Sequence, residues 1–234
     1  MKALLLAAGL GTRLRPVTER VPKCLVPIRG KPLLGYWFDL LFPAGIEGAV
    51  VNTHHLPEAV RAYVAASAWR DRIRLVHEPQ LLGTGGTVLA AREYLAGEAF
   101  LVIHADNLSR FDVPAFIDRH RTRPPGTEIT MMTFRTDVPR SCGIVGLDDR
   151  GVVMELHEKV EHPPGDIANA AVYIFEPSVL GFLAGLGGPF IDLSTQVLPR
   201  YLGRIFTYHN RDYHRDIGTP ESLRCAQAEY PVPG

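Results

Sequence analysis

The sequence predicts an α/β fold with a mixed, mostly parallel central sheet flanked by helices. Short apolar segments alternate with helix-like segments through the first half of the chain, as is typical of parallel strands joined by crossover helices. Each apolar segment is short and nearly uninterrupted, as in strands that are covered on both faces. The expected strands of this half are residues 2–7, 48–52, 73–77 and 100–104.

Helical patterns fill the gaps between these strands. Residues 33–41 carry apolar side chains at helical spacing, and the pattern stops where Pro43 would break a helix. Residues 57–66 and 87–95 show comparable patterns. This order predicts a single sheet, because each helix can return the chain to start another parallel strand.

The pattern becomes less regular after residue 106. The turn-forming residues 148–151 between two apolar segments predict a β-hairpin, and Thr219 is a suitable N-cap for a closing helix. The expected strands of this half are residues 128–134, 144–147, 152–157, 170–175 and 205–209. The expected helices are residues 114–121, 177–183, 192–201 and 220–228.

Composition argues against several classes of protein. The 234 residues include 25 basic and 25 acidic side chains, so no net charge would attract nucleic acid or an anionic membrane. The longest apolar runs, such as residues 3–8, are far too short to cross a bilayer, and the N-terminus leads into a strand-like run and not a cleavage site. The three widely spaced cysteines, Cys24, Cys142 and Cys225, are typical of free thiols and favour a cytoplasmic location.

The most informative segment is the loop that follows the first expected strand. Residues 6–14 read LAAGLGTRL, and Lys23 follows a few residues later. Gly9 and Gly11 let the backbone approach a ligand closely, and the exposed amides of such a turn form a nest for anions. Arg13 and Lys23 add the positive charge that phosphate oxygens require. The local chemistry therefore favours a triphosphate or pyrophosphate ligand.

Two carboxylates follow expected strands and point to a metal ion. Asp106 comes just after the strand at residues 100–104, and Asp216 lies between a strand and the closing helix. Ligands of open α/β sheets collect outside the carboxyl ends of strands, and Mg²⁺ binds a few carboxylates together with phosphate oxygens and water. The alternative is that Asp106 caps a helix and Asp216 pairs with an arginine. Together with the glycine loop, the two aspartates favour Mg²⁺.

Four motifs, in a fixed order, carry a resemblance to a known family. The chain resembles the sugar nucleotidyltransferases, or nucleoside-diphosphate-sugar pyrophosphorylases, and is most similar to their short mannose-1-phosphate guanylyltransferase type. The resemblance extends from Lys2 to about Ala228. The motifs are LAAGLGTRLRP at residues 6–16, PKCLVPI at 22–28 with GKP at 30–32, LGTGG at 82–86 and DIGTP at 216–220.

The resemblance implies a fold, a reaction and partners. It implies a Rossmann-like domain of the nucleotide-diphospho-sugar transferase type. No repeat or long linker interrupts the chain, so we expect one domain over residues 1–234, with a nucleotide-binding half of about 1–110 and a sugar-phosphate-binding half of about 111–230. The implied partners are a nucleoside triphosphate and a sugar 1-phosphate, with Mg²⁺ as the cofactor and, as in many members, a homodimer. No nucleic acid or membrane partner is expected.

The resemblance also implies roles for individual residues. Arg13 would contact the β- and γ-phosphates, and Lys23 would bridge the α-phosphate and the incoming sugar phosphate, which makes these two the catalytic candidates. Asp106 and Asp216 would hold Mg²⁺. The implied nucleotide contacts are Leu6, Ala7, Ala8, Gly9, Gly11, Thr12, Glu78, Gly83, Thr84 and Gly86. The implied sugar-phosphate contacts are Asn107, Gly143, Glu158, Lys159 and Asn169.

The residue before Pro79 bears on the choice of nucleobase. In the family this residue faces the edge of the base, and uridylyl and thymidylyl members commonly have Gln there, whereas this chain has Glu78. An ionised carboxylate only accepts hydrogen bonds, which suits the two adjacent donors of guanine better than the donor and acceptor of uracil or thymine. We therefore expect GTP. The alternative is that Glu78 faces solvent and that the backbone recognises the base, which leaves UTP or dTTP open.

The chain departs from the family pattern near the expected sugar pocket. Ala105, Val160 and Ala171 stand where the family usually has Gly, Pro and Gly. These changes leave the sugar open among mannose, glucose, a heptose and an amino sugar, with mannose favoured by the overall similarity.

Two other classes of function fit the sequence less well. A dinucleotide-binding oxidoreductase would need a third glycine in the loop and an acidic residue after the second strand, where the chain has Asn52. A non-catalytic nucleotide-sugar sensor would not need the two cations and two aspartates that the sequence retains.

Overall fold

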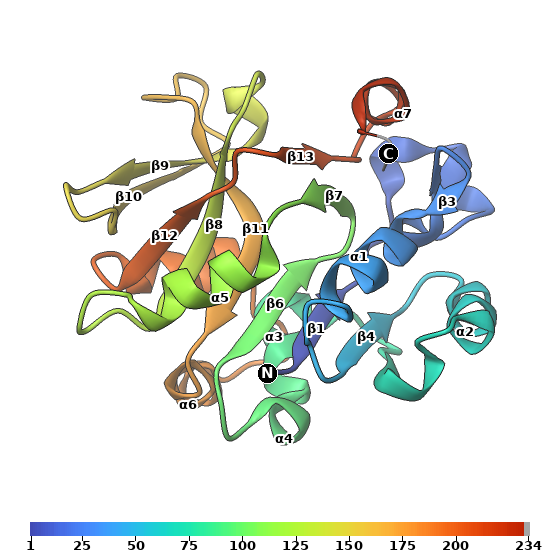
Figure 1. Cartoon of the computed structure of the whole chain (residues 1–234), viewed down its shortest axis with the longest axis horizontal. Helices are drawn as coiled ribbons and strands as arrows, with labels where there is room; N and C mark the ends of the chain where they lie inside the picture. The colour runs from blue at the N-terminus through green and yellow to red at the C-terminus, as the bar shows by residue number, and fades with distance from the viewer. Residues whose placement is uncertain (232–234) are drawn as a thin grey trace.

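Nine strands form one central sheet in a computed structural model that describes residues 1–231 (Figure 1). The strand order is β10-β9-β11-β6-β1-β4-β5, with β8 beside β11 and β12 beside β8. Residues 232–234, part of the expected single domain, lie outside the described residues. The strands are β1 (Ala3–Leu6), β4 (Ala49–Thr53), β5 (Ile73–His77), β6 (Phe100–His104), β8 (Ile129–Arg135), β9 (Gly143–Leu147), β10 (Val153–Glu158), β11 (Ile167–Phe175) and β12 (Ile205–His209).

The four strands of the N-terminal half are parallel. β1 pairs with β4 on one side and β6 on the other, and β4 pairs with β5. All four residues of β1 are buried, as expected for a central strand whose two faces are covered. The carboxyl ends of these strands therefore meet at one edge of the sheet, where Leu6 is in register with His104. The predicted mixed α/β sheet is confirmed.

The C-terminal half joins this sheet through the long strand β11. One edge of β11 pairs antiparallel with β8, and the other edge pairs first with β9 at Ala168 and then with β6 from Val172 onward. The pairing of β11 with β8 is irregular between Asn169 and Tyr173, close to where the other edge of β11 passes from β9 to β6. The β9–β10 hairpin therefore lies beyond the carboxyl end of β6, next to it along the same edge of β11.

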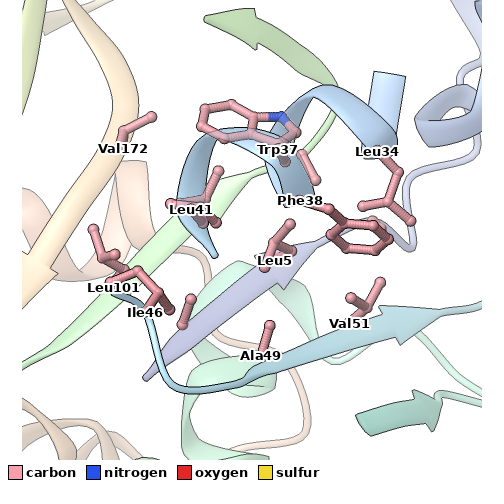
Figure 2. Packing of buried hydrophobic residues seen from close by; sticks show 14 of the residues in the cluster. Leu5, Leu34, Trp37, Phe38, Leu41, Ile46, Ala49, Val51, Leu101 and Val172 are labelled. Carbon is pink, nitrogen blue, oxygen red and sulfur yellow. The ribbon is translucent and has the colours of Figure 1, made fainter. Parts of the chain in front are cut away.

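Helices cover both faces of the sheet and enclose two apolar cores. One core packs the sheet against α1 (Leu33–Leu41), α2 (Pro57–Ala66) and α5 (Val113–Arg121). Figure 2 shows part of this core, with Trp37, Phe38 and Leu41 of α1 lying over Leu5 and Leu101. The other core involves α3 (Gly83–Ala90), α4 (Arg92–Leu95), α6 (Ser178–Leu186) and the segment after α6.

Most predicted elements are present, with some shifted bounds. The helix expected at residues 87–95 begins earlier, at Gly83, and is interrupted at Ala91 between α3 and α4. The helix expected at 192–201 is a π-helix at Leu193–Val197 followed by a 3-10 turn at Leu198–Tyr201. The closing helix, α7 (Pro220–Glu229), has the predicted Thr219 cap, whose hydroxyl oxygen accepts from the Ser222 amide.

Two short ribbons were not predicted. β2 (Pro27–Ile28) pairs with β3 (Lys31–Pro32), and β7 (Asn107–Arg110) pairs antiparallel with β13 (Tyr213–Asp216). Their strands have two to four residues, too few to show a periodic pattern. β13 and β7 lie side by side beyond the tip of β6 (Figure 1).

No helix among residues 1–231 combines the length and the apolar character that crossing a bilayer would require.

The irregular stretch of β11 gives a first prediction. Ala171 has a φ of 53°, in the left-handed region that favours glycine. We expect Ala171→Gly to raise the free energy of unfolding by about 0.5–1 kcal/mol, because relief of strain exceeds the added entropy of the unfolded chain. Urea denaturation measures this. Ala168→Gly, in the regular part of the same strand, is the control and should lower stability by a similar amount; a loss in both variants would contradict the prediction.

Candidate active site

The loop after β1 is held in a conformation that requires glycine. Gly11 has a φ of 62°, and a side chain there would bring a Cβ within 2.8 Å of a Thr18 methyl group. The Thr18 hydroxyl donates to the Gly11 carbonyl at 2.8 Å, and the Leu14 amide donates to the same carbonyl at 2.9 Å. Gly9 has open space around it. The predicted glycine turn is therefore present, with Gly11 shaping it and Gly9 leaving room beside it.

Lys23 lies between the two predicted metal-binding aspartates. Its ammonium group donates to Asp106 Oδ2 at 2.8 Å and to Asp216 Oδ1 at 3.1 Å. The Lys23 side chain is only 6% exposed, whereas Asp106 and Asp216 are 35% and 49% exposed. The three groups that the sequence assigned to one site thus meet around one buried cation.

Two elements bring these distant aspartates together. Asp106 immediately follows β6, and in the ribbon of β7 and β13 Asp216 is directly opposite Asn107. The Asn107 carbonyl accepts from Trp37 Nε1 at 2.9 Å, which anchors the ribbon to α1. Asn107 is itself buried, and its side-chain amide lies 3.5 Å from the Ala170 carbonyl. Asn107 therefore supports the site through backbone and packing.

The charges of the site stabilise one another. Burial acts to lower the pKa of Lys23, but the charges of Asp106 and Asp216 more than offset it and raise that pKa above its ordinary value. Burial acts to raise the pKa of Asp106, but Lys23 and His104 more than offset it and lower that pKa. Lys23 is therefore a cation and Asp106 an anion at neutral pH.

Arg13 is directed at the same carboxylate from the solvent side. Its Nη2 lies 3.5 Å from Asp216 Oδ2, and its side chain is 61% exposed. Gly218 makes this approach possible, because a Cβ there would come within 2.8 Å of Arg13 Nη2 and 2.7 Å of Asp216 Oδ2. The two predicted catalytic cations thus converge on Asp216.

The two aspartates fit a divalent cation such as Mg²⁺. Among residues 1–231, no group of three or more His, Cys, Asp and Glu side chains is placed to hold a metal ion. Mg²⁺ does not need such a group, because it takes one or two protein carboxylates and completes its shell with phosphate oxygens and water. Hard carboxylate oxygens from Asp106 and Asp216 already share one positive group, the Lys23 ammonium. Charge and ligand type both suit Mg²⁺.

A cavity of about 240 Å³ opens beside this cluster. It brings together seven of the predicted site residues: Leu6, Ala8, Gly9, Glu78, Gly83, Thr84 and Asp106. It is also lined by Asn52, Leu81, Thr87, His104, Phe190 and Asp192. Leu81 and Phe190 are 38% and 53% exposed and present apolar surface at its rim. The cavity therefore combines an apolar rim with polar groups, as in many small-molecule sites.

Glu78 forms a buried wall of this cavity. It is 3% exposed, so the alternative that it faces solvent is wrong. Its Oε1 accepts from Asn52 Nδ2 at 2.9 Å and from Thr87 Oγ1 at 2.6 Å, while among residues 1–231 its Oε2 accepts only from the Leu82 amide at 3.3 Å. Oε1 is saturated by protein donors, which leaves Oε2 as the carboxylate oxygen that can accept from a ligand.

Asn52 links this wall to the phosphate loop. Its Oδ1 accepts from the Ala7 amide at 2.6 Å, at the end of β1. Ala7 therefore uses its amide within the protein, and its predicted ligand contact would have to come from other atoms. Thr12, the first residue of a 3-10 turn at Thr12–Leu14, is exposed beside the loop.

The glycine-rich segment at residues 82–86 packs on a neighbouring backbone. A Cβ on Gly83 would lie 2.4 Å from the Ile191 carbonyl oxygen, and the amides of Gly85 and Gly86 donate to that oxygen at 2.8 and 3.1 Å. The Gly86 amide is thus used within the protein, and Gly86 does not line the cavity, whereas Gly83 and Thr84 do. The glycines allow close packing, a role that the sequence did not reveal.

The predicted sugar-phosphate residues lie on the C-terminal half. Glu158 of β10 is directly opposite Gly143 of β9, and Lys159 Nζ lies 3.3 Å from Glu158 Oε1. Lys159 has a φ of 51°, a strained conformation of the kind that gathers at functional sites. Asn169 Nδ2 donates to the Tyr173 hydroxyl at 2.8 Å. None of these residues lines the 240 Å³ cavity, so their assignment stays a prediction.

The sequence did not single out His104, Asp192 or Phe190, which line the cavity. His104 carries one signal that could have been used: it lies two residues before Asp106 on a strand, and alternate residues of a strand share a face. Burial lowers the pKa of His104, although Asp106 and Asp192 oppose this shift. Asp192 and Phe190 come from a distant segment with no local signal.

The family model for nucleotidyl transferases matches residues 2–231. The chain belongs to the nucleotidyl transferase family. It is 34% identical over 232 residues to a mannose-1-phosphate guanylyltransferase of Mycobacterium tuberculosis, with 97% of this chain and 64% of that protein covered. It is 35% identical over 180 residues to a glucose-1-phosphate thymidylyltransferase of Streptomyces griseus, with coverages of 76% and 50%.

Solved structures share the fold over nearly the whole chain. HddC from Yersinia pseudotuberculosis superposes with a TM-score of 0.83 at 24% identity, covering 98% of this chain and 99% of that one. A UDP-glucose pyrophosphorylase from Acinetobacter baumannii gives a TM-score of 0.81 at 20% identity, with coverages of 98% and 92%. By contrast, the chain spans only 50% to 64% of the length of the two curated relatives above.

The Glu78 wall gives a second prediction. We expect Thr87→Val to lower the free energy of unfolding by about 1–3 kcal/mol, because a buried carboxylate oxygen loses a donor. Chemical denaturation measures this loss. A double-mutant cycle with Glu78→Met isolates the hydrogen bond and should show a coupling of about 1 kcal/mol; additive effects would contradict the assigned bond.

Proposed function

We propose that the protein is a sugar-1-phosphate nucleotidyltransferase, which joins a nucleoside triphosphate to a sugar 1-phosphate and releases pyrophosphate. One observation carries the proposal: Lys23 and Arg13 converge on Asp216, with Asp106 on the other side of Lys23, beside a glycine loop and a cavity. The named activities of the relatives support it. The three free cysteines support a reducing compartment such as the cytoplasm.

The reaction needs no nucleophilic side chain. An oxygen of the sugar phosphate, already an anion at neutral pH, attacks the α-phosphorus of the triphosphate. A new P–O bond forms, and the bond from that phosphorus to the oxygen bridging to the β-phosphate breaks, so that pyrophosphate leaves with the electron pair. The main difficulties are the approach of two anions and the charge that builds on the leaving group. Positioned cations address both.

Lys23 is suited to the approach of the two anions. Two of its three N–H groups are held by Asp106 and Asp216, which fixes the direction of the third. Arg13 is exposed and able to follow the departing pyrophosphate with several donors. Asp106 and Asp216 would hold Mg²⁺, which when bound would neutralise phosphate charge and help to orient the phosphates.

The roles of Arg13 and Asp106 give a third prediction. We expect Arg13→Ala and Asp106→Ala each to lower kcat/KM by ~10²–10³-fold, because each removes a preorganised charge from the transition state. Pyrophosphate release in the presence of Mg²⁺ measures the rate, and thermal unfolding checks the fold. Arg20→Ala removes an exposed arginine from the same loop and serves as the control, with activity near wild type. Activity near wild type in Arg13→Ala or Asp106→Ala would contradict the assignment.

We further propose GTP and mannose 1-phosphate as the favoured substrates. A mannose-1-phosphate guanylyltransferase is among the relatives that align over almost the whole chain. Glu78 supports guanine, since its Oε2 can accept from a base and can donate nothing.

One observation also favours a second candidate, a UTP- or dTTP-dependent enzyme. Because Oε1 is saturated, only one carboxylate oxygen remains, and the single N–H of uracil or thymine could satisfy it. Uridylyl- and thymidylyltransferases are also among the relatives.

A matrix of nucleoside triphosphates against sugar 1-phosphates, scored by product mass, separates these candidates and gives a fourth prediction. We expect GTP to be preferred, and Glu78→Gln to shift the ratio of kcat/KM from GTP toward UTP by roughly 10- to 100-fold, because the amide places a donor where Oε2 accepted. A wild-type preference for UTP or dTTP would overturn the guanine proposal. Binding of nucleotide and sugar without turnover of any pair would favour the sensor.

A further inference from the structure

His104 has a buried ring nitrogen that nothing in the described chain satisfies. Its Nε2 is shielded from solvent and has no hydrogen-bond partner among residues 1–231. Buried polar atoms in proteins are nearly always paired, so an orphan of this kind calls for an explanation. His104 as a residue is partly exposed, and it lines the 240 Å³ cavity. A ligand atom cannot reach Nε2 in the present ring position, but a rotation of the ring toward the cavity would let a ligand there supply the missing partner.

Acidic and hydroxyl groups line the cavity together with His104. Asp106 and Asp192 line the same cavity as His104, and Thr84 lies beside Asp192. Asp192 Oδ1 accepts from the amide and hydroxyl of Thr195, both at 2.9 Å, while within the described part of the chain Oδ2 accepts only from Thr84 Oγ1 at 3.3 Å. Asp106 is paired with Lys23, whereas Asp192 Oδ2 carries no paired cation among residues 1–231, so the His104 and Asp192 side of the cavity favours an uncharged group that both donates and accepts. A sugar hydroxyl has that character.

The strand order places His104 on the sugar side of the site. On one side of β1 come β4 and then β5, and Glu78, the proposed base contact, follows β5. On the other side of β1 comes β6, which ends at His104. Next to β6 comes β11, which carries Asn169, and then the hairpin with Glu158. The base, the phosphates and the sugar would therefore follow one another across the strand tips.

A direct contact supports this placement. The His104 ring packs edge to face against the Tyr173 ring, with centroids 6.4 Å apart. The Tyr173 hydroxyl in turn accepts from Asn169 Nδ2 at 2.8 Å. Tyr173 is fully buried and fixes the orientation of both neighbours.

We propose that His104, with Asp192 beside it, hydrogen-bonds a hydroxyl of the acceptor sugar and thereby helps to determine which sugar 1-phosphate is accepted. This inference rests on the proposed function, since it assigns a specificity role within that site. His104 is a substrate contact in this proposal and takes no part in the bond-breaking step.

Three variants test the assignment. His104→Leu removes the hydrogen-bonding nitrogens, His104→Asn retains a donor and an acceptor, and His209→Leu makes the same change at an exposed position on β12 that does not line the cavity. Steady-state kinetics are measured with the best pair from the substrate matrix and with single-deoxy analogues of that sugar 1-phosphate. Thermal unfolding identifies any variant that fails to fold.

The proposal makes a specific kinetic pattern the expected result. His104→Leu should lower kcat/KM for the sugar 1-phosphate by about tenfold, the size of one neutral hydrogen bond, with the KM for the nucleotide changed less than about twofold. His104→Asn should recover part of the loss, and His209→Leu should match wild type. One deoxy analogue should cost wild type about tenfold and His104→Leu nothing further, which identifies the hydroxyl.

Other outcomes would overturn the inference. A change confined to the nucleotide KM would place His104 against the ribose or base. Equal losses for every deoxy analogue in wild type and His104→Leu would exclude a hydroxyl contact. If His104→Leu does not fold, wild-type kinetics that no deoxy analogue lowers would exclude it. In both cases the wild-type enzyme still turns over, so the proposed function survives. Absence of turnover by wild type with every substrate pair would instead refute the proposed function.

Discussion

The pairing of one buried lysine with two aspartates is the constraint on which the rest of the site depends. Lys23 bonds to Asp106 and Asp216, which are far apart in the sequence. A buried ammonium without such partners would be strongly destabilised or would lose its proton. The ribbon of β7 and β13 therefore has a chemical purpose, since it holds Asp216 where it can share the charge of Lys23 with Asp106. The arrangement also keeps Lys23 charged, because the two aspartates raise its pKa.

The order of strands then lays out the other parts of the site around this cluster. Parallel strands end at one edge, so loops from β1, β5 and β6 surround one cavity. β11 extends past β6 and pairs with β9, which places Asn169, Gly143 and Glu158 on the far side. A long, linear ligand such as a nucleotide-sugar, the product of the proposed reaction, would match this order of surfaces. His104, at the end of β6, lies between the loop after β1 and the residues of β11 and its hairpin.

Hydrogen bonds within the protein limit what several residues can offer a ligand. Asn52 and Thr87 occupy one oxygen of Glu78, and Ile191 occupies the amides of Gly85 and Gly86. These internal hydrogen bonds fix the side chains in place, and fixed side chains can distinguish nucleobases by their geometry. The carboxylate of Glu78 therefore has one oxygen, Oε2, that can still accept from a ligand. One available oxygen favours the two donors of guanine less strongly than two would.

The sequence by itself determined the α/β fold and most element positions, and it predicted the charged residues that meet beside the cavity, because periodicity, glycine turns and the capping Thr219 are local signals. The tertiary structure decided how those residues meet. The four-residue strands of β7 and β13 have no readable period, yet their pairing joins Asp106 and Asp216. Likewise, the burial of Glu78 and the exposure of His104 to the cavity depend on contacts with segments distant in sequence. A periodic pattern indicates which face of a helix or strand is buried, but it does not indicate which other segment packs against that face.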